Sequence, residues 1–358
     1  MAEVHDILRA AIERGGSDVF IIPGSCVRLK VSGEVQSLMD TVLKPDDTKR
    51  LIKQVYELDS REMDRLLEHG DDDFSFSISG VGRFRCNAYQ QRNSLAMVLR
   101  VVSLSLPDPA KMHIPDAILK LADIKKGLVL VTGPAASGKS TTLACIIDRI
   151  NTNRRGHIIT IEDPIEFIHS HKASVLSQRE VEHDTASYRT ALRAALRQAP
   201  DVILLGEMRD LETIQTALTA AETGQLVLST LHTIGAAKTI DRIIDVFPAN
   251  QQQQIRVQLS MVLRAVVSQQ LLPTVEGDLE PAFEIMLNNS AIQNMIRDGK
   301  AHQMDNVIFS GAEEGMRTMD AEIARLYADR RVTRETALLF AANPEQLKKR
   351  LSEIDKLT

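Results

Sequence analysis

What this sequence lacks excludes several kinds of protein. No apolar run approaches the roughly 20 residues that a membrane-spanning helix needs. The first residues, Met1–Asp6, carry neither the basic start nor the apolar stretch of a signal peptide. We therefore expect a soluble, intracellular protein with no segment inserted in a membrane, which leaves docking on a membrane complex open.

Cysteine and positive charge are also scarce. The three cysteines, Cys26, Cys86 and Cys145, are scattered and form no C-x-x-C pair, so the sequence suggests neither a zinc site nor a disulfide framework. We expect them to be small buried residues in a reducing compartment. The net charge of −5 lacks the basic footprint of nucleic-acid-binding proteins, so no direct contact with nucleic acid is expected.

The 358 residues are enough for two domains with cores of their own. Residues 1–102 combine helical spacing with short alternating runs, and a Gly-Val-Gly turn joins 73–79 to 83–89 as in a β-hairpin. This pattern predicts a small α+β domain with a mostly antiparallel sheet. Three prolines follow within 103–118, and because proline interrupts regular pairing we expect a linker there.

The pattern changes in the third region, 119–358. Compact apolar runs alternate with helix-length segments, which indicates parallel strands covered by helices on both faces. In such sheets ligands bind beyond the carboxyl ends of the strands. After residue 250 we expect helices, including 251–270 and a C-terminal helical region at about 288–358. The four apolar runs are 128–131, 158–161, 202–205 and 226–230.

The segment Gly-Pro-Ala-Ala-Ser-Gly-Lys-Ser fits the phosphate-binding loop G-x-x-x-x-G-K-[ST]. An apolar strand precedes it and a helix follows, so that backbone N–H groups and the positive end of the helix dipole point at a polyphosphate. Lys139 is expected to reach the β- and γ-phosphates of ATP, and the Ser140 hydroxyl to bind Mg²⁺. The residues expected to bind the nucleotide are Gly133, Pro134, Ala135, Ala136, Ser137, Gly138, Lys139, Ser140 and Thr141.

Acidic residues follow the second and third apolar runs. Glu162 is expected to orient or deprotonate the attacking water; a solvated acidic turn is the alternative. Glu207 stands where a Walker-B carboxylate would hold Mg²⁺, one position later than usual because Gly206 intervenes. Both side chains are therefore candidates for phosphate chemistry.

Basic residues complete the candidate set. His232 follows the fourth run and is expected to sense or bond the γ-phosphate, with a structural histidine as the alternative. Arg83 and Arg85 share one face of a predicted strand, and Arg100 lies on the next. A ring-shaped ATPase needs a positive group from a neighbouring subunit to stabilise the leaving phosphate, so these arginines are candidates; surface or ion-paired arginines are the alternative.

Four segments resemble the motif boxes of the secretion/pilus ATPase superfamily, and within it the chain is similar to the PilT-type retraction ATPases of type IV pili. The resemblance implies an α/β fold, a RecA-like P-loop core with a parallel sheet. It implies a PAS-like α+β domain before that core and C-terminal helices after it. The four segments are Gly133–Thr142, Ile159–Phe167, Pro200–Thr213 and Thr223–Thr233.

The resemblance also implies a function. Members hydrolyse ATP with Mg²⁺ as a homohexamer, bind ATP between subunits, and retract type IV pili in twitching motility. They work in the cytoplasm at the inner face of the cell membrane, on an inner-membrane pilus platform protein and indirectly on the pilin filament. Glu162, Glu207 and His232 fall in the family's Asp, Walker-B and His boxes, and the three arginines fall where the family places its trans-acting ones.

Two departures from the family pattern bear on this function. Where the family usually has Pro-Thr-Gly, Pro134 is followed by Ala135 and Ala136, so nucleotide affinity or turnover can differ. The segment Ala291–Met295 also differs from the family's retraction-linked motif, which leaves the direction of work open. A secretion-system or accessory pilus ATPase, and a nucleotide-gated scaffold with little turnover, are the alternatives.

Overall fold

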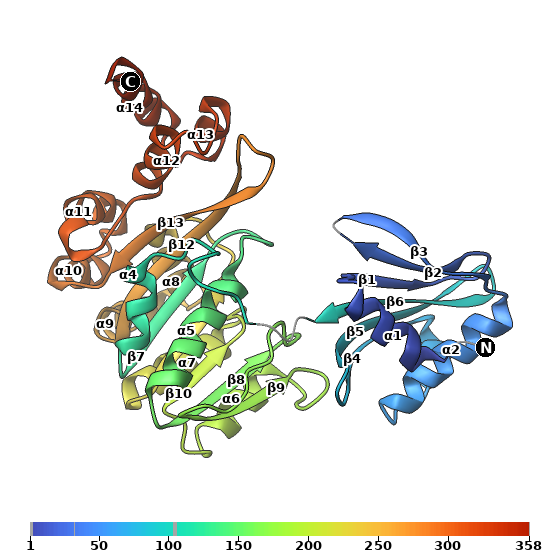
Figure 1. The fold of residues 1–358 in the computed structure, drawn as a ribbon. Helices are drawn as coiled ribbons and strands as arrows, with labels where there is room; N and C mark the ends of the chain where they lie inside the picture. Colours follow the sequence, from blue (N-terminus) through green and yellow to red (C-terminus); the bar gives the residue numbers. More distant parts are fainter. Residues whose placement is uncertain (1–2, 32, 103–105, 358) are drawn as a thin grey trace. The chain divides into compact units, whose positions relative to one another are not determined.

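The computed structural model describes residues 3–31, 33–102 and 106–357. The chain divides into two compact units, of which Figure 1 draws the first mainly in blue and the second in green to red. The first unit comprises residues 1–105 with the short segment 166–168, and the second comprises the remainder. Each unit has its own sheet and its own hydrophobic core.

The first unit contains an antiparallel sheet of order β3-β2-β1-β6-β5-β4. An α+β arrangement is thus present, as expected. The sequence pattern does not indicate β3 or the break between α2 and α3. The elements are α1 (Val4–Glu13), β1 (Asp18–Ile21), β2 (Cys26–Val31), β3 (Glu34–Val42), α2 (Pro45–Leu58), α3 (Asp64–His69), β4 (Asp71–Ile78), β5 (Gly82–Gln91) and β6 (Ser94–Val102).

Aromatic residues fill part of the core of this unit. Phe76 stacks on Phe84 with 5.5 Å between ring centroids, and Phe74 packs on Tyr56 at 4.8 Å. The Tyr56 hydroxyl donates a hydrogen bond of 2.9 Å to Asp72. The buried polar end of the ring is therefore satisfied, and the aromatic cluster carries no unpaired hydroxyl at that point.

The second unit is built on a sheet of order β13-β12-β7-β11-β10-β8-β9. Neighbouring strands are parallel except β12 and β13, which are antiparallel. The four apolar runs of the sequence are β7, β8, β10 and β11, so the expected parallel sheet is confirmed. The elements up to β13 are α4 (Asp116–Leu119), η1 (Lys120–Asp123), β7 (Gly127–Thr132), α5 (Lys139–Asn153), β8 (His157–Glu162), β9 (Val175–Glu180), α6 (Tyr188–Ala195), β10 (Val202–Leu205), α7 (Leu211–Thr223), β11 (Leu226–Leu231), α8 (Ala236–Asp245), α9 (Ala249–Val262), β12 (Leu263–Pro273) and β13 (Leu279–Leu287).

Helices cover both faces of this sheet (Figure 1). Along β7, Leu128 and Leu130 belong to the core that α7, α8 and α9 share, whereas Val129 and Val131 belong to the core that α5 shares. All four side chains are fully buried. Because β7 is enclosed on both sides, it gives the loop that follows it a rigid base.

The prediction of helices after residue 250 is wrong for the second half of 251–270 and for 279–287, which form strands β12 and β13. Helix α9 ends at Val262 and strand β12 begins at Leu263. No glycine or proline marks this boundary, whereas the β-branched Val266 and Val267 favour a strand. The segment is a strand because it pairs with β7 on one side and β13 on the other.

Residues 106–118, within the segment predicted as a linker, belong to the second unit. Ile114 and Ile118 lie four positions apart and are buried in the core that α5 shares. These two apolar side chains attach the segment to the sheet, so it is not a free linker. Residues 103–105 of the same prediction lie outside the described residues.

Helices follow the last strand, as Figure 1 shows in orange and red. Leu272 of β12 and Ala282 of β13 pack with α12, α13 and α14 in a separate small core. Helices α12, α13 and α14 are therefore anchored to the antiparallel edge of the sheet, whereas α10 and α11 pack in the core that α7, α8 and α9 share. The C-terminal helices are α10 (Ser290–Asp298), η2 (Ala301–Gln303), α11 (Met304–Ser310), η3 (Ala312–Glu314), α12 (Met319–Ala328), α13 (Arg334–Phe340) and α14 (Pro344–Leu357).

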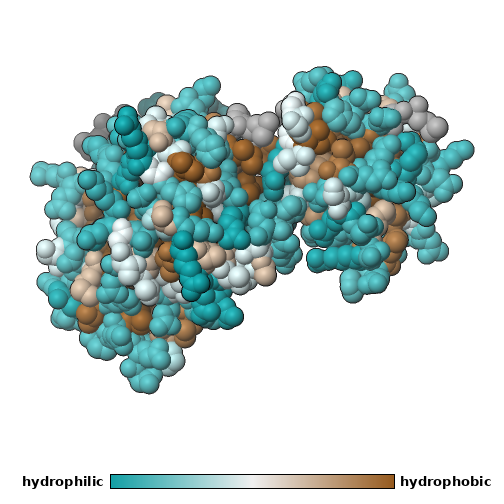
Figure 2. Space-filling view, turned by 90° about the horizontal axis from the view of Figure 1, so that it is seen from below, coloured by the Kyte–Doolittle hydropathy of each residue, from teal (hydrophilic) through white to brown (hydrophobic). Residues whose placement is uncertain are grey.

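Figure 2 shows one face, on which hydrophilic residues predominate and hydrophobic ones lie in several separate areas. Phe309 of α11 and Leu339 of α13 are among the exposed large apolar side chains. Over the described ranges, no helix combines the length and the apolar character that crossing a bilayer requires.

Candidate nucleotide site

The candidate site lies at the carboxyl ends of four neighbouring strands of the second unit. The strands β7, β11, β10 and β8 are parallel and in register, with Thr132 at the end of β7 opposite Leu231 at the end of β11. The fold thereby brings the predicted residues of this unit to one edge of the sheet. In the strand order given, the ends lead to the phosphate loop, His232, Glu207 and Glu162.

Two glycines shape the phosphate loop. Gly133 has a φ of +143°, and a Cβ there would lie 2.1 Å from the carbonyl oxygen of Gln269. Gly138 has a φ of +85°, and its Cβ would lie 2.8 Å from the side-chain nitrogen of Gln269. Both positions therefore require glycine. Gln269 also accepts a 2.8 Å hydrogen bond from the Thr142 hydroxyl, so β12 supports the loop from the neighbouring strand.

The loop contains a cation and several unused donors. Lys139 Nζ donates to the carbonyl oxygens of Gly133 and Pro134 at 3.0 and 2.7 Å. Ser137 is 2% exposed, and its hydroxyl has no hydrogen-bond partner among the described residues. The N–H groups of residues 135–138 donate to no protein acceptor in the described part of the chain. This combination of groups suits an anion such as a phosphate.

Ala136 adopts an unfavourable backbone conformation. Its φ is +60°, in the left-handed region, which costs a residue with a Cβ about 1–2 kcal/mol. Its neighbour Ala135 does not have a positive φ. The second alanine therefore stands where the loop geometry itself favours glycine.

Glu162 is the last residue of β8. Ile158, Thr160 and Glu162 alternate onto one face of the strand, and Ile158 packs in the core that α5 shares. Glu162 therefore lies on the face of the sheet that the helix of the phosphate loop covers. Its Oε1 accepts a 2.6 Å hydrogen bond from the Thr160 hydroxyl, so strand β8 itself helps to orient the carboxylate.

The carboxylate of Glu207 contacts a residue from another of the predicted motif segments. It is 8% exposed, and its carboxylate pairs with Arg209 (Oε1–Nε 2.5 Å) and with His232 (Oε2–Nε2 3.4 Å). Burial raises the pKa of the Tyr188 hydroxyl, and the negative charges of Asp163 and Glu207 raise it further. The acidic segments after β8 and β10 thus act on the same hydroxyl.

A hollow of about 480 Å³ opens beside Glu207. The His232 side chain that lines it is 57% exposed, so a solvent-borne group can reach the imidazole. Two guanidinium groups add positive charge to the acidic and hydroxyl groups of the lining. The polar lining residues are Glu207, Arg209, Thr230, His232, Thr233 and Arg242.

The protein groups near the loop fit Mg²⁺ only together with a nucleotide. Over the described ranges, no group of three or more His, Cys, Asp or Glu side chains is arranged to hold a metal ion by itself. Ser140, half-buried at the start of α5, supplies a hydroxyl, and Glu207 supplies a carboxylate. Mg²⁺ is commonly bound by one or two such groups with substrate phosphates and water completing its shell.

A comparison with known protein families agrees with the phosphate loop and the motif segments described above. The family Type II/IV secretion system protein matches residues 1–338. The chain belongs to this family. The family expected from the sequence motifs is thereby confirmed.

Two relatives and one solved structure of this secretion-system family cover nearly the whole chain. The chain is 42% identical to the type IV pilus retraction ATPase PilT of Pseudomonas aeruginosa, over 96% of its own length and 99% of the relative. It is 40% identical to the type IV pilus ATPase PilU of the same organism, over 97% and 90%. A crystal structure of the pilus retraction motor PilT with bound ADP is similar with a TM-score of 0.90 and 45% identity, over 98% of this chain and all of that one.

The candidate arginines of this family member lie on its first unit. Arg85 on β5 is directly opposite Arg100 on β6, and Arg83 lies two positions along on the same face. Between them Phe84 is fully buried on the other face. Arg100 pairs with Asp18 at 2.9 Å. Like charges directly opposite each other destabilise a sheet, but Asp18 compensates the charge of Arg100, which agrees with the ion-paired alternative for that residue.

Three polar residues of the site carry no role in the sequence analysis. Gln269 lies in the segment predicted to be helical, where the polar residues Ser268, Gln269 and Gln270 between apolar neighbours are the available signal. Arg209 stands beside Glu207 in the third motif box, but its pairing cannot be read from spacing. Tyr188 precedes β10 by more than ten positions, and only the fold brings it next to Gly206, whose Cβ would lie 2.8 Å from the Tyr188 hydroxyl.

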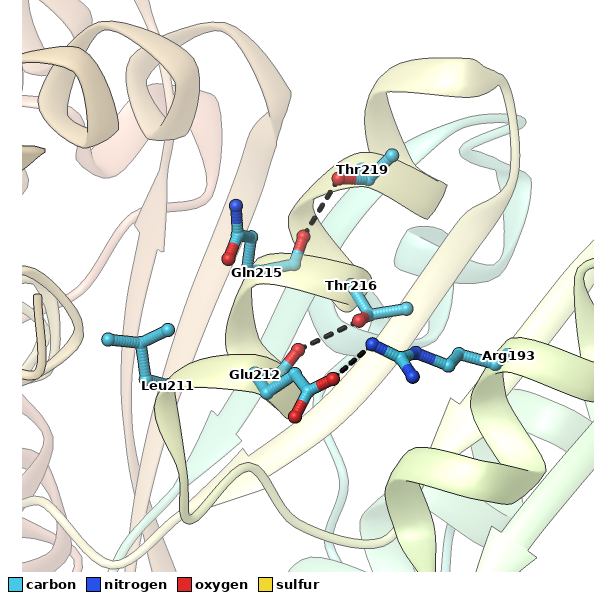
Figure 3. A pocket seen from close by; sticks show the side chains of 6 residues that line it. All are labelled: Arg193, Leu211, Glu212, Gln215, Thr216 and Thr219. Carbon is cyan, nitrogen blue, oxygen red and sulfur yellow. Dashed lines mark hydrogen bonds and ion pairs between the residues drawn. The ribbon is translucent and has the colours of Figure 1, made fainter.

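A second hollow, of about 570 Å³, lies on the surface of α6 and α7 (Figure 3). Arg193 forms an ion pair with Glu212. The hydroxyls of Thr216 and Thr219 donate to the carbonyl oxygens of Glu212 and Gln215 within α7, at 2.8 and 2.9 Å. Because these polar groups are already paired within the protein, the hollow does not resemble the nucleotide site.

Proposed function

We propose that this chain is a Mg²⁺-dependent ATPase that works as a homohexameric ring and drives the retraction of type IV pili. The open phosphate loop at the start of α5 is the observation that carries the ATPase part of the proposal. The similarity to PilT and to PilU over nearly the whole chain supports the pilus part. The PilT structure that it resembles contains ADP, which supports a nucleotide as the ligand.

The proposed reaction assigns one role to each group. Lys139 and the loop N–H groups hold the phosphates. Glu162 takes a proton from a water molecule while the oxygen of that water attacks the γ-phosphorus. The bond between the γ-phosphorus and the bridging oxygen breaks, and ADP and phosphate leave. Bound Mg²⁺, held by Ser140 and Glu207, would neutralise charge on the phosphates. His232 would sense the γ-phosphate through its contact with Glu207.

In the proposed ring, a neighbouring subunit supplies positive charge to the bound nucleotide. Arg83, Arg85 and Arg100 would reach the nucleotide of a neighbouring subunit and stabilise the charge that develops on the leaving phosphate. We further propose that the ring works in the cytoplasm, at the inner face of the cell membrane. Its partners there would be a pilus platform protein and, through that protein, the pilin filament.

The phosphate loop can be tested with one substitution and one matched control. Lys139→Ala should lower steady-state phosphate release at least about 100-fold, because it removes the cation of the loop. Lys172→Ala removes a lysine that pairs with Asp148 near the far end of α5 (2.6 Å) and should leave the rate unchanged. Wild-type turnover by Lys139→Ala would contradict the ATPase assignment.

An accessory pilus ATPase is the second candidate function. The identities of 42% to PilT and 40% to PilU are nearly equal, so similarity alone favours neither. Deleting the gene in its own host should abolish twitching if the chain is the main motor. A loss of force with twitching retained would favour the accessory role, and phosphate release no faster than that of Glu162→Gln would favour a nucleotide-gated scaffold.

A further inference from the structure

Strand β9 fixes the end of β8, where Glu162 lies. The two strands are parallel, with Gln178 opposite Thr160 and Glu180 opposite Glu162. The Val181 N–H donates to the Glu162 carbonyl oxygen at 2.8 Å. Because alternate residues of a strand share a face and paired residues lie side by side, these four side chains stand on one face of the sheet.

The side chain of Gln178 links Glu162 to the backbone. Its Nε2 donates to Glu162 Oε1 at 3.3 Å, and its Oε1 accepts from the His169 N–H at 2.8 Å. A backbone N–H can only donate, so the amide oxygen must face His169 and the amide N–H₂ must face Glu162. The Thr160 hydroxyl donates to the same carboxylate oxygen. Two donors from two strands therefore converge on one atom of Glu162.

The next residue on this face holds the turn that follows Glu162. Glu180 is 4% exposed, and its Oε2 accepts a 2.9 Å hydrogen bond from the Ile165 N–H. The N–H of Glu180 in turn donates to Asp184 at 2.8 Å. Strand β9 thus fixes the Glu162 side chain, its carbonyl group and the backbone after it.

We propose that Gln178 is a positioning residue for ATP hydrolysis, which holds the Glu162 carboxylate in the orientation that takes a proton from water. The inference rests on the proposed role of Glu162 as the general base. A base must stay within hydrogen-bond reach of its proton, and a misplacement of about 1 Å can cost as much as 100-fold in rate. Gln178 has this effect without contact with the nucleotide.

Two variants separate orientation from folding. Gln178→Glu keeps the oxygen that accepts from His169 but places a negative charge where the donor to Glu162 stood. Gln178→Leu keeps a similar volume and removes both hydrogen bonds. We expect kcat for ATP to fall at least about tenfold in both. The KM for ATP in Gln178→Leu, and its affinity for ADP, should stay within about threefold of wild type, because no phosphate contact is lost.

A residue on the opposite face of the same strand gives the control. The Ser177 hydroxyl contacts His157 Nε2 at 3.0 Å, so Ser177→Ala removes one hydrogen bond from β9 without touching Glu162. Its kcat should equal that of wild type. A comparable fall in kcat for Ser177→Ala would mean that any weakening of β9 lowers the rate, which would overturn the specific role of Gln178.

A double-mutant cycle decides whether Gln178 acts through Glu162. In single-turnover assays of the full ring, Gln178→Leu should have no further effect in a Glu162→Gln background. The same fold-loss in both backgrounds would overturn the inference, as would an unchanged kcat in Gln178→Leu itself. If Glu162→Gln keeps the wild-type rate, the inference fails while the ATPase assignment stands; that assignment depends on Lys139→Ala.

Discussion

Helices α5 and α8 of the second unit both begin after a glycine. The backbone N–H groups near the two helix starts differ in their hydrogen-bond partners. Helix α5 follows Gly138 (φ +85°) and helix α8 follows Gly235 (φ +93°), and neither glycine can supply a side-chain cap. At α8 a buried carboxylate replaces the cap, since Glu284 accepts from the Ala236 N–H at 2.8 Å. In the loop that leads into α5, no protein acceptor takes the N–H groups of residues 135–138 among the described residues.

The difference supports the proposed role of the start of α5 as the place where a ligand binds. Glu284 also accepts from the Met319 N–H at 3.3 Å, so one buried carboxylate closes the starts of α8 and α12. Burial raises the pKa of Glu284, and the two N–H donors oppose that rise. The protein therefore provides an internal acceptor at α8, whereas the proposed function assigns the corresponding place at α5 to a phosphate from outside.

Removing the carboxylate that accepts from the N–H groups at the starts of α8 and α12 should have the largest effect on stability. Glu284→Leu leaves two buried N–H groups without an acceptor, each of which costs about 1–3 kcal/mol. We expect the free energy of unfolding of the second unit to fall by about 2–4 kcal/mol in urea denaturation. Glu284→Gln keeps one acceptor oxygen and should lose less. An unchanged midpoint in Glu284→Leu would mean that this carboxylate does not close the helices.

The far end of α5 gives a pH-dependent test. Burial lowers the pKa of His169 to about 4, while Asp148 opposes the effect and Lys172 adds to it. The imidazole is therefore neutral in the folded protein above about pH 4. Above its ordinary pKa of 6.5 the neutral form prevails in both states, so its burial favours the fold most at high pH. As the pH falls from 6.5 to about 4, only the unfolded chain takes up a proton.

The expected loss of unfolding free energy follows from the change in pKa, and a variant without the imidazole provides the control. At 1.36 kcal/mol per pH unit, the interval from 6.5 to about 4 corresponds to about 3 kcal/mol at most. Wild type should lose up to that amount of unfolding free energy more than His169→Phe over this range, in denaturation curves measured at each pH. Parallel pH profiles of the two proteins would contradict a buried neutral imidazole.

The smallest expected effect on stability is the difference between glycine substitutions at the two alanines of the phosphate loop. Ala136→Gly relieves the left-handed strain but adds freedom to the unfolded chain, so the net change should be between zero and about 1 kcal/mol of stabilisation. Ala135→Gly relieves no such strain and should destabilise by about 0.4–1 kcal/mol. Thermal denaturation of both variants checks the difference in sign. Equal destabilisation would mean that Ala136 is not strained.

The sequence pattern predicts the elements that carry strong local signals. The loop from Gly133 to Ser140, the parallel strands around it and the shared face of Arg83 and Arg85 each follow from spacing or periodicity within one segment. The linker prediction overlooks Ile114 and Ile118, whose partners lie on α5 and in the sheet. Local pattern therefore identifies the loop and strand ends but not what packs against them.

The residues that sequence reasoning misses depend on distant partners. Gln269 supports the loop from a strand more than 100 positions away, and Glu284 closes a helix that starts almost 50 positions earlier. Gln178 reaches Glu162 only because β9 joins the edge of the sheet, and β9 itself is not indicated by the pattern. Such contacts arise from strand order and register, which a single sequence does not specify.

Amide hydrogen exchange tests the contrast between the two helix starts most directly. With Mg²⁺ and ADP, the N–H groups of residues 135–138 should exchange markedly more slowly than in the free protein, because phosphate oxygens become their acceptors. The Ala236 N–H, already bonded to Glu284, should exchange at the same rate with and without nucleotide. Unchanged exchange over 135–138, with protection at the start of α8 instead, would contradict the account.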